Sequence, residues 1–419
     1  MCMGMTMAEK ILARASGKKE AKAGEYVTAN VDMIMMHDGF GSVSTVLENT
    51  GITRVFDPDK IVVLLDHQVP PGSLVGAELY RRVRNAVKKF QIKNWYDWKA
   101  GICHQIMPEK GHVLPGSLII GTDSHTTTYG ALGAAATGMG FSDAAYAVTT
   151  GKQWFLVPET VKFVLKGKFP PRVMSKDALL YLAGKYTAEV AQYKAVEFSG
   201  PGAKEMSLSS RMTMSNMGVE IGAKFAFFEA DEKTLAFLKG RVNKPVSKFG
   251  PDPDAVYEKV YEVDLSALEP QVAFPHTVDN VRPISQVGDV RIDQVFLGSC
   301  TNARLEDLQI AAEILKGKKI HPDVRMIVTP ASMEVYREAM HGGLFDVFID
   351  AGAIIQNPTC GACQGVHTGL LAPGERCISS TNRNFKGRMG SPESEVYLAS
   401  PATVAASAIA GKIADPRKV

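Results

Sequence analysis

Short, apolar, β-branched runs recur along the chain, and each leads through a polar loop into a pattern of helical spacing. Four examples are "KIVVLLDHQVP", "SLIIGTDSHTTTYGALGAAATG", "QVFLGSCTNARLEDLQIAAEILKG" and "VRMIVTPASMEVYREAMHGG". In the third, 292–297 has the pattern of a strand and 298–302 that of a turn. Leu308, Ala311 and Leu315 then repeat at the spacing of an apolar helix stripe. This alternation predicts an α/β fold with largely parallel sheets.

The length of the chain predicts more than one domain. A protein of 419 residues exceeds what one hydrophobic core normally holds. A stretch rich in proline and charge runs from 244 to 283, as connections between domains often do. We therefore expect one part of the chain to end at residue 284 and a separate α/β unit to occupy 285–419.

Composition argues against several classes of protein. Hydrophobic residues make up 45% of the chain and charged residues 22%, and a net charge of +3 lacks the concentrated basic field of nucleic-acid binders. No apolar run approaches the roughly 18–20 residues that span a bilayer. The N-terminal segment also lacks the apolar core of a signal peptide. We expect a cytoplasmic protein without nucleic-acid or membrane partners.

Polar loops follow several of the expected strands. They are the segments "DH", "TDSHT", "GSCTNAR", "NPTCGAC" and "TNRNFKGR". Open α/β sheets bind ligands beyond the carboxyl ends of their strands. The loops are therefore predicted to converge on one cleft.

The cysteines indicate a metal or redox site. Six are too few and too scattered for a disulfide framework, so reduced thiols are expected. Cys360 and Cys363 lie three positions apart and Cys300 follows another strand, which suits a redox pair, a zinc site with His367, or an iron–sulfur cluster. Three thiolates without a fourth favour a 4Fe-4S cluster with one iron that lacks a protein ligand and acts as a Lewis acid. The cysteines expected to be structural are Cys2, Cys103 and Cys377.

The ordered motifs "GTDSHT", "GSCTNAR", "NPTCGAC" and "TNRNFKGRMG" resemble those of the aconitase superfamily, in particular the separate large subunits of the 3-isopropylmalate dehydratase and homoaconitase type. The resemblance covers nearly the whole chain. It implies an aconitase-like fold around a central iron–sulfur cleft, with domains 1 and 2 intertwined in 1–284 and a third domain in 285–419. It also implies that Cys300, Cys360 and Cys363 hold the 4Fe-4S cluster.

The activity implied by this resemblance is that of a hydro-lyase, which isomerises a 2-hydroxy diacid by removing and re-adding water. Isopropylmalate, from leucine biosynthesis, is the favoured substrate because that pathway is the more widespread one. Homocitrate or homoaconitate is the alternative substrate. A zinc-stabilised structural or binding protein is a more remote alternative.

Residue chemistry supplies candidates for such a reaction. Dehydration needs an acid for the leaving hydroxyl group and cations for the carboxylates. A carboxylate beside an imidazole raises the imidazole pKa and makes an acid available near neutral pH. Two such sets follow strands: Asp66 with His67, and Asp123 with His125. Arg383 and Arg388 can present planar forks to two carboxylates, although loop arginines are often only surface charge.

The resemblance adds further residues to the expected site. His37 follows an apolar run, as an active-site histidine of the family does, and Glu220 is expected to support another such histidine. Asn216 lies four positions before Glu220, so both are expected on one helix face, with Asn216 near the cluster. The other expected contacts are Ser124 and Asn382 for the substrate and Asn302 for the cluster.

The resembled aconitases continue into a swivelling domain that supplies a serine base and further substrate arginines. This sequence ends at residue 419 without a matching segment. The resemblance therefore predicts a separate small subunit that carries the swivelling domain and the catalytic serine, and an active enzyme that is a heteromer.

Overall fold

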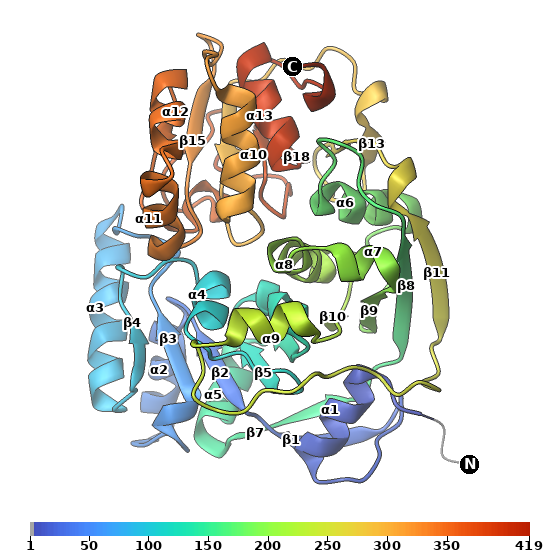
Figure 1. Cartoon of the computed structure of the whole chain (residues 1–419). Coiled ribbons are helices and arrows are strands. Elements are labelled where there is room, and N and C mark those ends of the chain that lie inside the picture. The colour runs from blue at the N-terminus through green and yellow to red at the C-terminus, as the bar shows by residue number, and fades with distance from the viewer. Residues whose placement is uncertain (1–3) are drawn as a thin grey trace.

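The computed structural model describes residues 4–419, so Cys2 lies outside the described residues. The strands of the described residues form four sheets, three of which are mainly parallel. Helices lie around and between these sheets (Figure 1). This mixed architecture confirms the α/β fold with largely parallel sheets that the sequence predicts.

A wholly parallel sheet with strand order β4-β3-β2-β5-β6 is built from the N-terminal part of the chain. Its strands are β2 (Met33–Met36), β3 (Ile61–Leu64), β4 (Asn94–Tyr96), β5 (Leu118–Gly121) and β6 (Ala135–Gly138). The helices that pack around it include α2 (Phe40–Asn49), α3 (Leu74–Lys89), α4 (Cys103–Glu109) and α5 (Phe141–Thr150). Every residue of β3 and β5 is buried, as expected for strands covered on both faces.

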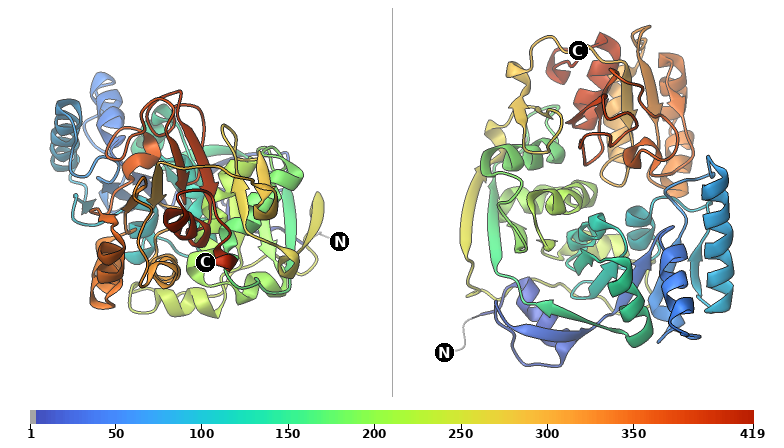
Figure 2. Two further views of the ribbon diagram at one scale, coloured as in Figure 1. Left: turned by 90° about the horizontal axis from the view of Figure 1, so that it is seen from above. Right: turned by 180° about the vertical axis from the view of Figure 1, so that it is seen from behind.

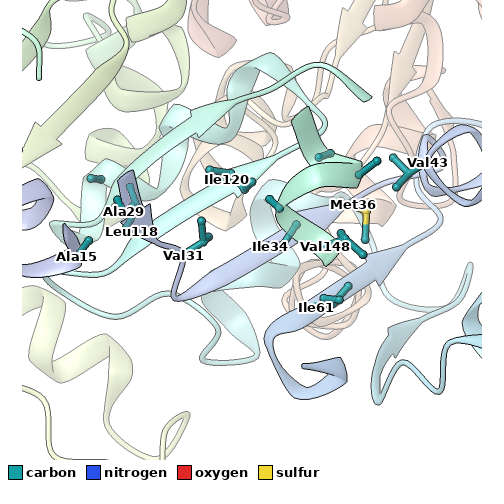
Figure 3. Close-up of a cluster of buried hydrophobic side chains, with 14 of the residues drawn as sticks. Ala15, Ala29, Val31, Ile34, Met36, Val43, Ile61, Leu118, Ile120 and Val148 are labelled. Carbon is teal, nitrogen blue, oxygen red and sulfur yellow. The ribbon is translucent and has the colours of Figure 1, made fainter. Parts of the chain in front are cut away.

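Alternate residues of β2 enter two different hydrophobic cores. Ile34 and Met36 belong to a cluster that includes Val148 of α5 (Figure 3). Met35 belongs to a second cluster, which includes Ile106 of α4. Successive side chains of a strand point to opposite faces, so the continuous run "MIMM" serves both cores.

A second parallel sheet has the order β10-β9-β8-β11. Its strands are β8 (Thr160–Lys166), β9 (Ala195–Ser199), β10 (Phe225–Phe228) and β11 (Lys259–Asp264). The 3-10 segment η2 (Ser124–Leu132) packs so closely on β10 that a side chain at Gly130 would overlap the carbonyl oxygen of Ala226. This approach fixes the "TDSHT" segment against the second sheet. An antiparallel ribbon pairs β1 (Tyr26–Asn30) with β7 (Lys152–Leu156).

The C-terminal part of the chain forms a seven-stranded sheet with the order β13-β12-β18-β17-β14-β15-β16. Its strands are β12 (Gln271–Ala273), β13 (Val281–Pro283), β14 (Gln294–Leu297), β15 (Arg325–Val328), β16 (Ile354–Ile355), β17 (Arg376–Ser379) and β18 (Glu395–Ala399). Its helices are α10 (Leu305–Leu315), α11 (Met333–His341), α12 (Leu344–Ala351) and α13 (Pro401–Ala410). Strand β14, the turn after it and α10 occur where the sequence predicts them.

The stretch 244–283 is more than the simple connection that its composition suggests. It contains β11, which completes the second sheet, and β12 and β13, which form one edge of the seven-stranded sheet. The two edge strands have three residues each, too few for a hydrophobic period to be recognised. The division into 1–284 and 285–419 stays a prediction.

The first and last described residues lie at opposite ends of the molecule (Figure 2). Helix α8 (Leu208–Asn216) lies between the C-terminal unit and the five-stranded sheet (Figure 1). The remaining α-helices of the described residues are α1 (Met7–Ser16), α6 (Ser175–Tyr186), α7 (Gly200–Glu205) and α9 (Glu232–Leu238). Within residues 4–419, every helix is too short or too polar to cross a membrane.

Candidate active site

Loops from the five-stranded and seven-stranded sheets meet at one pocket. The pocket has a volume of about 630 Å³. Its lining includes His37, His67, Asp123, Ser124, Arg383 and Arg388. Three of the five predicted loops, "DH", "TDSHT" and "TNRNFKGR", thus meet at this pocket, while the chemical roles of their residues stay predictions.

The three cysteines expected to hold a cluster are buried free thiols. Cys300 lies in the turn after β14, whereas Cys360 and Cys363 lie at the 3-10 turn η6 (Gly361–Gln364). The Nδ2 atoms of Asn216 and Asn382 each lie 3.3 Å from Cys300 Sγ. The Cys363 thiol donates to Asn382 Oδ1 at 3.6 Å. Asn216 is therefore at the thiols as predicted, and Asn382, predicted to touch substrate, contacts two of them.

The three thiols differ in how readily they ionise. Burial raises the pKa of Cys300 to about 12. A hydrogen bond between Cys360 and Cys363 lowers the pKa of Cys363 to about 5, with help from Arg388, and raises the pKa of Cys360 well above its ordinary value. The set therefore resists full ionisation unless positive charge is added, which is what metal binding provides.

Asp66 orients His67 and anchors the backbone of a neighbouring helix. His67 Nδ1 lies 2.7 Å from Asp66 Oδ1, and the Cys103 N–H donates to Asp66 Oδ2 at 2.7 Å. Burial raises the pKa of Asp66, but the interaction with His67 outweighs it and the pKa falls to about 2. Burial lowers the pKa of His67, yet Asp66 and Asp123 together bring it well above its ordinary value. His67 is therefore an imidazolium at neutral pH.

Asp123 lies at the centre of three histidines. His104 Nε2 lies 2.8 Å from Asp123 Oδ1, His125 Nδ1 lies 3.3 Å from the same oxygen, and His67 Nε2 lies 3.7 Å from Asp123 Oδ2. The pKa of Asp123 is well below its ordinary value, because these hydrogen bonds outweigh a burial effect in the opposite direction. Sequence reasoning missed His104, whose other nitrogen lies 3.1 Å from the Tyr129 hydroxyl. Its segment "GICHQ" offers no motif that could have identified it.

Glu220 links His125 to Arg383. Its Oε1 atom lies 2.7 Å from His125 Nε2 and accepts a hydrogen bond from Arg383 Nε at 2.7 Å. Burial lowers the pKa of His125, but Asp123 and Glu220 raise it above its ordinary value overall. The helix expected to carry both Asn216 and Glu220 ends at Asn216 and continues as the 3-10 turn η3 (Met217–Ile221). The expectation of one α-helix through both residues is wrong, whereas Glu220 does contact a histidine, the contact that the resemblance implies for it.

Both ring nitrogens of His37 are occupied. Its Nε2 atom lies 3.1 Å from the Thr122 carbonyl oxygen, and its Nδ1 accepts a hydrogen bond from the Gly39 N–H at 3.1 Å. The His37 ring also packs on His67, with ring centroids 4.4 Å apart. These contacts fix the orientation of the His37 ring and support a packing function for it beside His67.

The two pocket residues Arg388 and Ser124 are placed to meet a ligand. Arg388 Nη2 lies 3.9 Å from Cys363 Sγ, and its buried Nε lacks a hydrogen-bond partner among the described residues. Ser124 begins η2 and lines the pocket. Asn302 differs, because its side-chain amide donates to Asp307 of α10 at 3.1 Å and not to a thiol. The predicted contact of Asn302 with a cluster therefore gains no support from its hydrogen bonds.

The alternative ligand His367 and the structural cysteine Cys377 have other partners. His367 is half-buried, and its Nε2 lies 2.6 Å from the Pro70 carbonyl oxygen. Cys377 is buried within β17, and its thiol lies 3.5 Å from the Ile378 carbonyl oxygen. The contact of His367 with Pro70 gives no support to a zinc site made from Cys360, Cys363 and His367, and the burial of Cys377 fits the structural role expected for it.

Comparison with known proteins shows that the chain belongs to the aconitase family. Residues 9–411 match the model of the aconitase family (aconitate hydratase). A protein of Methanothermobacter thermautotrophicus named "Probable 3-isopropylmalate dehydratase large subunit" is 53% identical over 415 residues, which cover 99% of each chain. The "3-isopropylmalate dehydratase large subunit" of Aquifex aeolicus is 49% identical over 423 residues, which cover 100% of this chain and 98% of that one. The crystal structure of Thermococcus kodakaraensis aconitase X (holo-form) aligns with a TM-score of 0.49 and 13% identity over 85% of this chain and 84% of that chain.

Proposed function

Because this chain belongs to the aconitase family, we propose that it is the large subunit of a 3-isopropylmalate dehydratase, a hydro-lyase of leucine biosynthesis. One observation carries the proposal: three buried free thiols adjoin a pocket lined by His67, Asp123 and Arg383. Imidazolium acids can protonate the leaving hydroxyl, guanidinium groups can bind the carboxylates, and thiolates can hold a metal centre that polarises the hydroxyl. The names of the full-length relatives support the choice of isopropylmalate over homocitrate.

The donor set fits an iron–sulfur cluster better than a single metal ion. Among the described residues, the one group of three ligand atoms within 4.8 Å of one another belongs to His37, Asp66 and His67 and includes no thiol. Thiolates around one zinc ion would lie closer, about 3.8 Å apart for Zn–S bonds of about 2.3 Å. The three thiols do not all lie that close to one another, which suits ligands to different irons of a cluster. Amide groups of Asn216 and Asn382 beside Cys300 suit a cluster as well, because hydrogen bonds to its sulfurs tune it.

We propose a 4Fe-4S cluster held by Cys300, Cys360 and Cys363, with one iron free of protein ligands. When bound, the cluster supplies a Lewis-acidic iron that polarises the hydroxyl group of the substrate. The proposal that one iron lacks a protein ligand rests on the number of thiols in the site, because three thiols are one fewer than the four irons of such a cluster.

The side chains of the pocket provide the rest of the chemistry. His67 and His125 are the imidazolium groups that can give a proton to the leaving hydroxyl, and Asp66 and Asp123 keep them charged and oriented. Arg383 uses its Nε to bind Glu220, which leaves its terminal nitrogens for a carboxylate. Arg388 and Ser124 supply further donors at the pocket wall.

We also propose a partner, a small subunit that carries the swivelling domain and a serine base. The relatives that match this chain over nearly their full length are named large subunits, which supports a second, smaller chain in the active enzyme. The partner would close the pocket and deliver the base that removes the carbon-bound proton. The cytoplasmic location expected from the sequence stays a prediction.

An activity assay with the cognate small subunit tests the function. The chain is reconstituted anaerobically with iron and sulfide, mixed with the small subunit and given isopropylmalate or homocitrate in parallel. We expect formation of the unsaturated acid from isopropylmalate, and little turnover by the isolated chain. Turnover restricted to homocitrate would support the homoaconitase alternative, and a colourless, zinc-containing, inactive protein would contradict the proposal.

A further inference from the structure

Two buried cations lie behind the thiol loops without a carboxylate partner. Lys176 of α6 is 0% exposed and Arg304 is 3% exposed. All the side-chain hydrogen bonds of these cations go to carbonyl, amide or hydroxyl oxygens. Arg211 shows the usual arrangement for a buried cation, because its guanidinium lies 2.6 Å from the Asp231 carboxylate. A buried charge without such a counter-ion is costly, so its presence calls for a reason.

The nearest acidic residues in sequence do not neutralise these cations by direct contact. Asp177 accepts hydrogen bonds from the backbone N–H groups of Met174 and Gln271. Asp307 accepts from the Arg304 backbone N–H and from the Asn302 side chain, not from the guanidinium. Burial raises the pKa of Asp177 and of Asp307 to about 7, so neither carboxyl is a firm anion at neutral pH.

Each cation instead donates hydrogen bonds to the backbone of a loop that carries site residues. Lys176 Nζ donates to the Ser380 carbonyl at 2.6 Å and to the Thr381 carbonyl, directly before Asn382. Arg304 Nη2 donates to the Cys300 carbonyl at 2.9 Å. Its Nη1 donates to the Thr301 carbonyl at 2.8 Å, and its Nε to Gln105 Oε1 of α4 at 2.9 Å. The two positive charges are thus attached to the loops of Cys300 and Asn382.

The thiols are the anions that these cations face when a metal centre is bound. Burial lowers the pKa of Lys176 to about 7 and the pKa of Arg304 below its ordinary value. Negative charge on Cys363 and Cys300 acts in the opposite direction on Lys176, and negative charge on Asp307 and Cys300 does so on Arg304, so ionised thiols favour the charged form of both side chains. Thiolate ligands stay ionised in a metal centre, so the positive charges then gain counter-ions within a site of low dielectric constant.

We propose that Lys176 and Arg304 are positioning residues that hold a buried positive charge behind the thiol loops, offset the negative charge of the thiolates, and raise the reduction potential of the cluster. The inference rests on the proposed function, because it needs a cluster at these thiols. Net charge around a cluster is one of the factors that set its potential. The backbone hydrogen bonds keep each charge at a constant place relative to Cys300 and Asn382.

Variants that separate charge from hydrogen bonding test this inference. Lys176→Gln and Arg304→Gln remove a charge but keep an N–H donor, whereas Arg304→Lys keeps the charge and loses donors. Lys10→Met is the control for a lost charge, since Lys10 pairs with Asp252 and contacts no residue of the thiol loops. The full-length chains are reconstituted anaerobically, and the midpoint potential of each cluster is measured by spectroelectrochemical titration.

We expect lower potentials in Lys176→Gln and Arg304→Gln, a larger decrease in the double variant, and wild-type potentials in Arg304→Lys and Lys10→Met. Potentials of both glutamine variants that match Lys10→Met would overturn the inference. A shift in Arg304→Lys as large as in Arg304→Gln would also overturn it, because the hydrogen bonds alone would then matter. Wild-type protein that takes up no iron and sulfide would instead refute the proposed function.

Discussion

The Nε2 atom of His125 lies 2.7 Å from the carboxylate of Glu220, although the two residues are 95 positions apart in the chain. Both side chains are buried, and the same carboxylate oxygen accepts a hydrogen bond from Arg383. Glu220 therefore does two things at once: it keeps His125 protonated and it orients a guanidinium at the pocket. Several expectations about the reaction depend on this contact.

Glu220→Gln should lower kcat/KM by a factor of about 10²–10⁴, the usual contribution of an acid–base group. Glu220 helps raise the pKa of His125, so the imidazolium persists to higher pH in the wild type. Without the carboxylate the pKa of His125 falls, and the alkaline limb of the pH profile should move to lower pH. Profiles of the complex with its small subunit measure this shift. The control Glu189→Gln removes an exposed carboxylate near Glu220 and should leave the profile unchanged.

Cys300→Ser, Cys360→Ser and Cys363→Ser should each prevent stable uptake of iron and sulfide, because serine is a poor ligand for this cluster. Cys103→Ser and Cys377→Ser replace buried cysteines without that function and should keep the cluster. Iron and sulfide analysis after anaerobic reconstitution gives the answer. Normal iron content in a variant of the first group would remove that residue from the ligand set.

Arg383→Lys should impair turnover strongly even though the positive charge is retained. Arg383 binds Glu220 through Nε and still has two terminal nitrogens for a substrate carboxylate, whereas an ammonium group cannot make both contacts in this geometry. We expect KM to rise and kcat to fall in steady-state assays of the complex. Arg376→Lys is a control, because Arg376 pairs with Glu395 at the exposed start of β17. Equal losses in both variants would argue against a special function of Arg383.

His112 should make the protein less stable in mild acid. Burial lowers the pKa of His112 to about 4, and its Nε2 lies 2.7 Å from the Tyr96 hydroxyl. Between pH 6.5 and about 4 the unfolded chain binds a proton that the folded chain excludes, so the free energy of unfolding falls as the pH falls. The loss reaches about 3 kcal/mol at the acid end, at 1.36 kcal/mol per pKa unit.

His112→Gln removes this effect, so the difference in free energy of unfolding between wild type and variant should change with pH in that window. Urea unfolding at a series of pH values measures it. The exposed residue His341 provides the control His341→Gln. A wild-type-minus-variant difference that is constant with pH would show that the pKa of His112 is the same in the folded and unfolded chains.

Gly130→Ala should destabilise the protein by about 2 kcal/mol, because overpacking against a rigid backbone forces η2 and β10 apart. The added methyl group would overlap the Ala226 carbonyl oxygen. Gly250→Ala is the matched control, since its methyl group would meet only the Glu229 side chain, at 3.3 Å. Thermal unfolding compares the two. Equal melting temperatures of the Gly130→Ala and Gly250→Ala variants would mean that η2 and β10 can move apart at little cost in free energy.

Local sequence patterns predict the elements of this fold well. The apolar runs at β3, β5 and β14 and the apolar stripe of α10 occur where periodicity places them, because strand and helix spacing depend on neighbours only a few positions apart. The polar motifs at the strand ends could be located in the sequence for the same reason, because each directly follows a recognisable strand pattern. The thiols Cys300, Cys360 and Cys363 were recognised because each lies within such a motif.

The arrangement of the site depends on contacts between distant parts of the chain. Packing of one sheet against another brings Asp66 to the backbone N–H of Cys360, and no pattern within either segment encodes that approach. His104 joins Asp123 only because α4 packs beside η2, and the Nε2 atom of His37 contacts the carbonyl oxygen of Thr122, 85 positions away. Burial and these neighbours also decide which histidines carry a proton. Residue types therefore indicate the chemistry, whereas the charge and orientation of each group follow from tertiary packing, because desolvation and pairing act only once the sheets have come together.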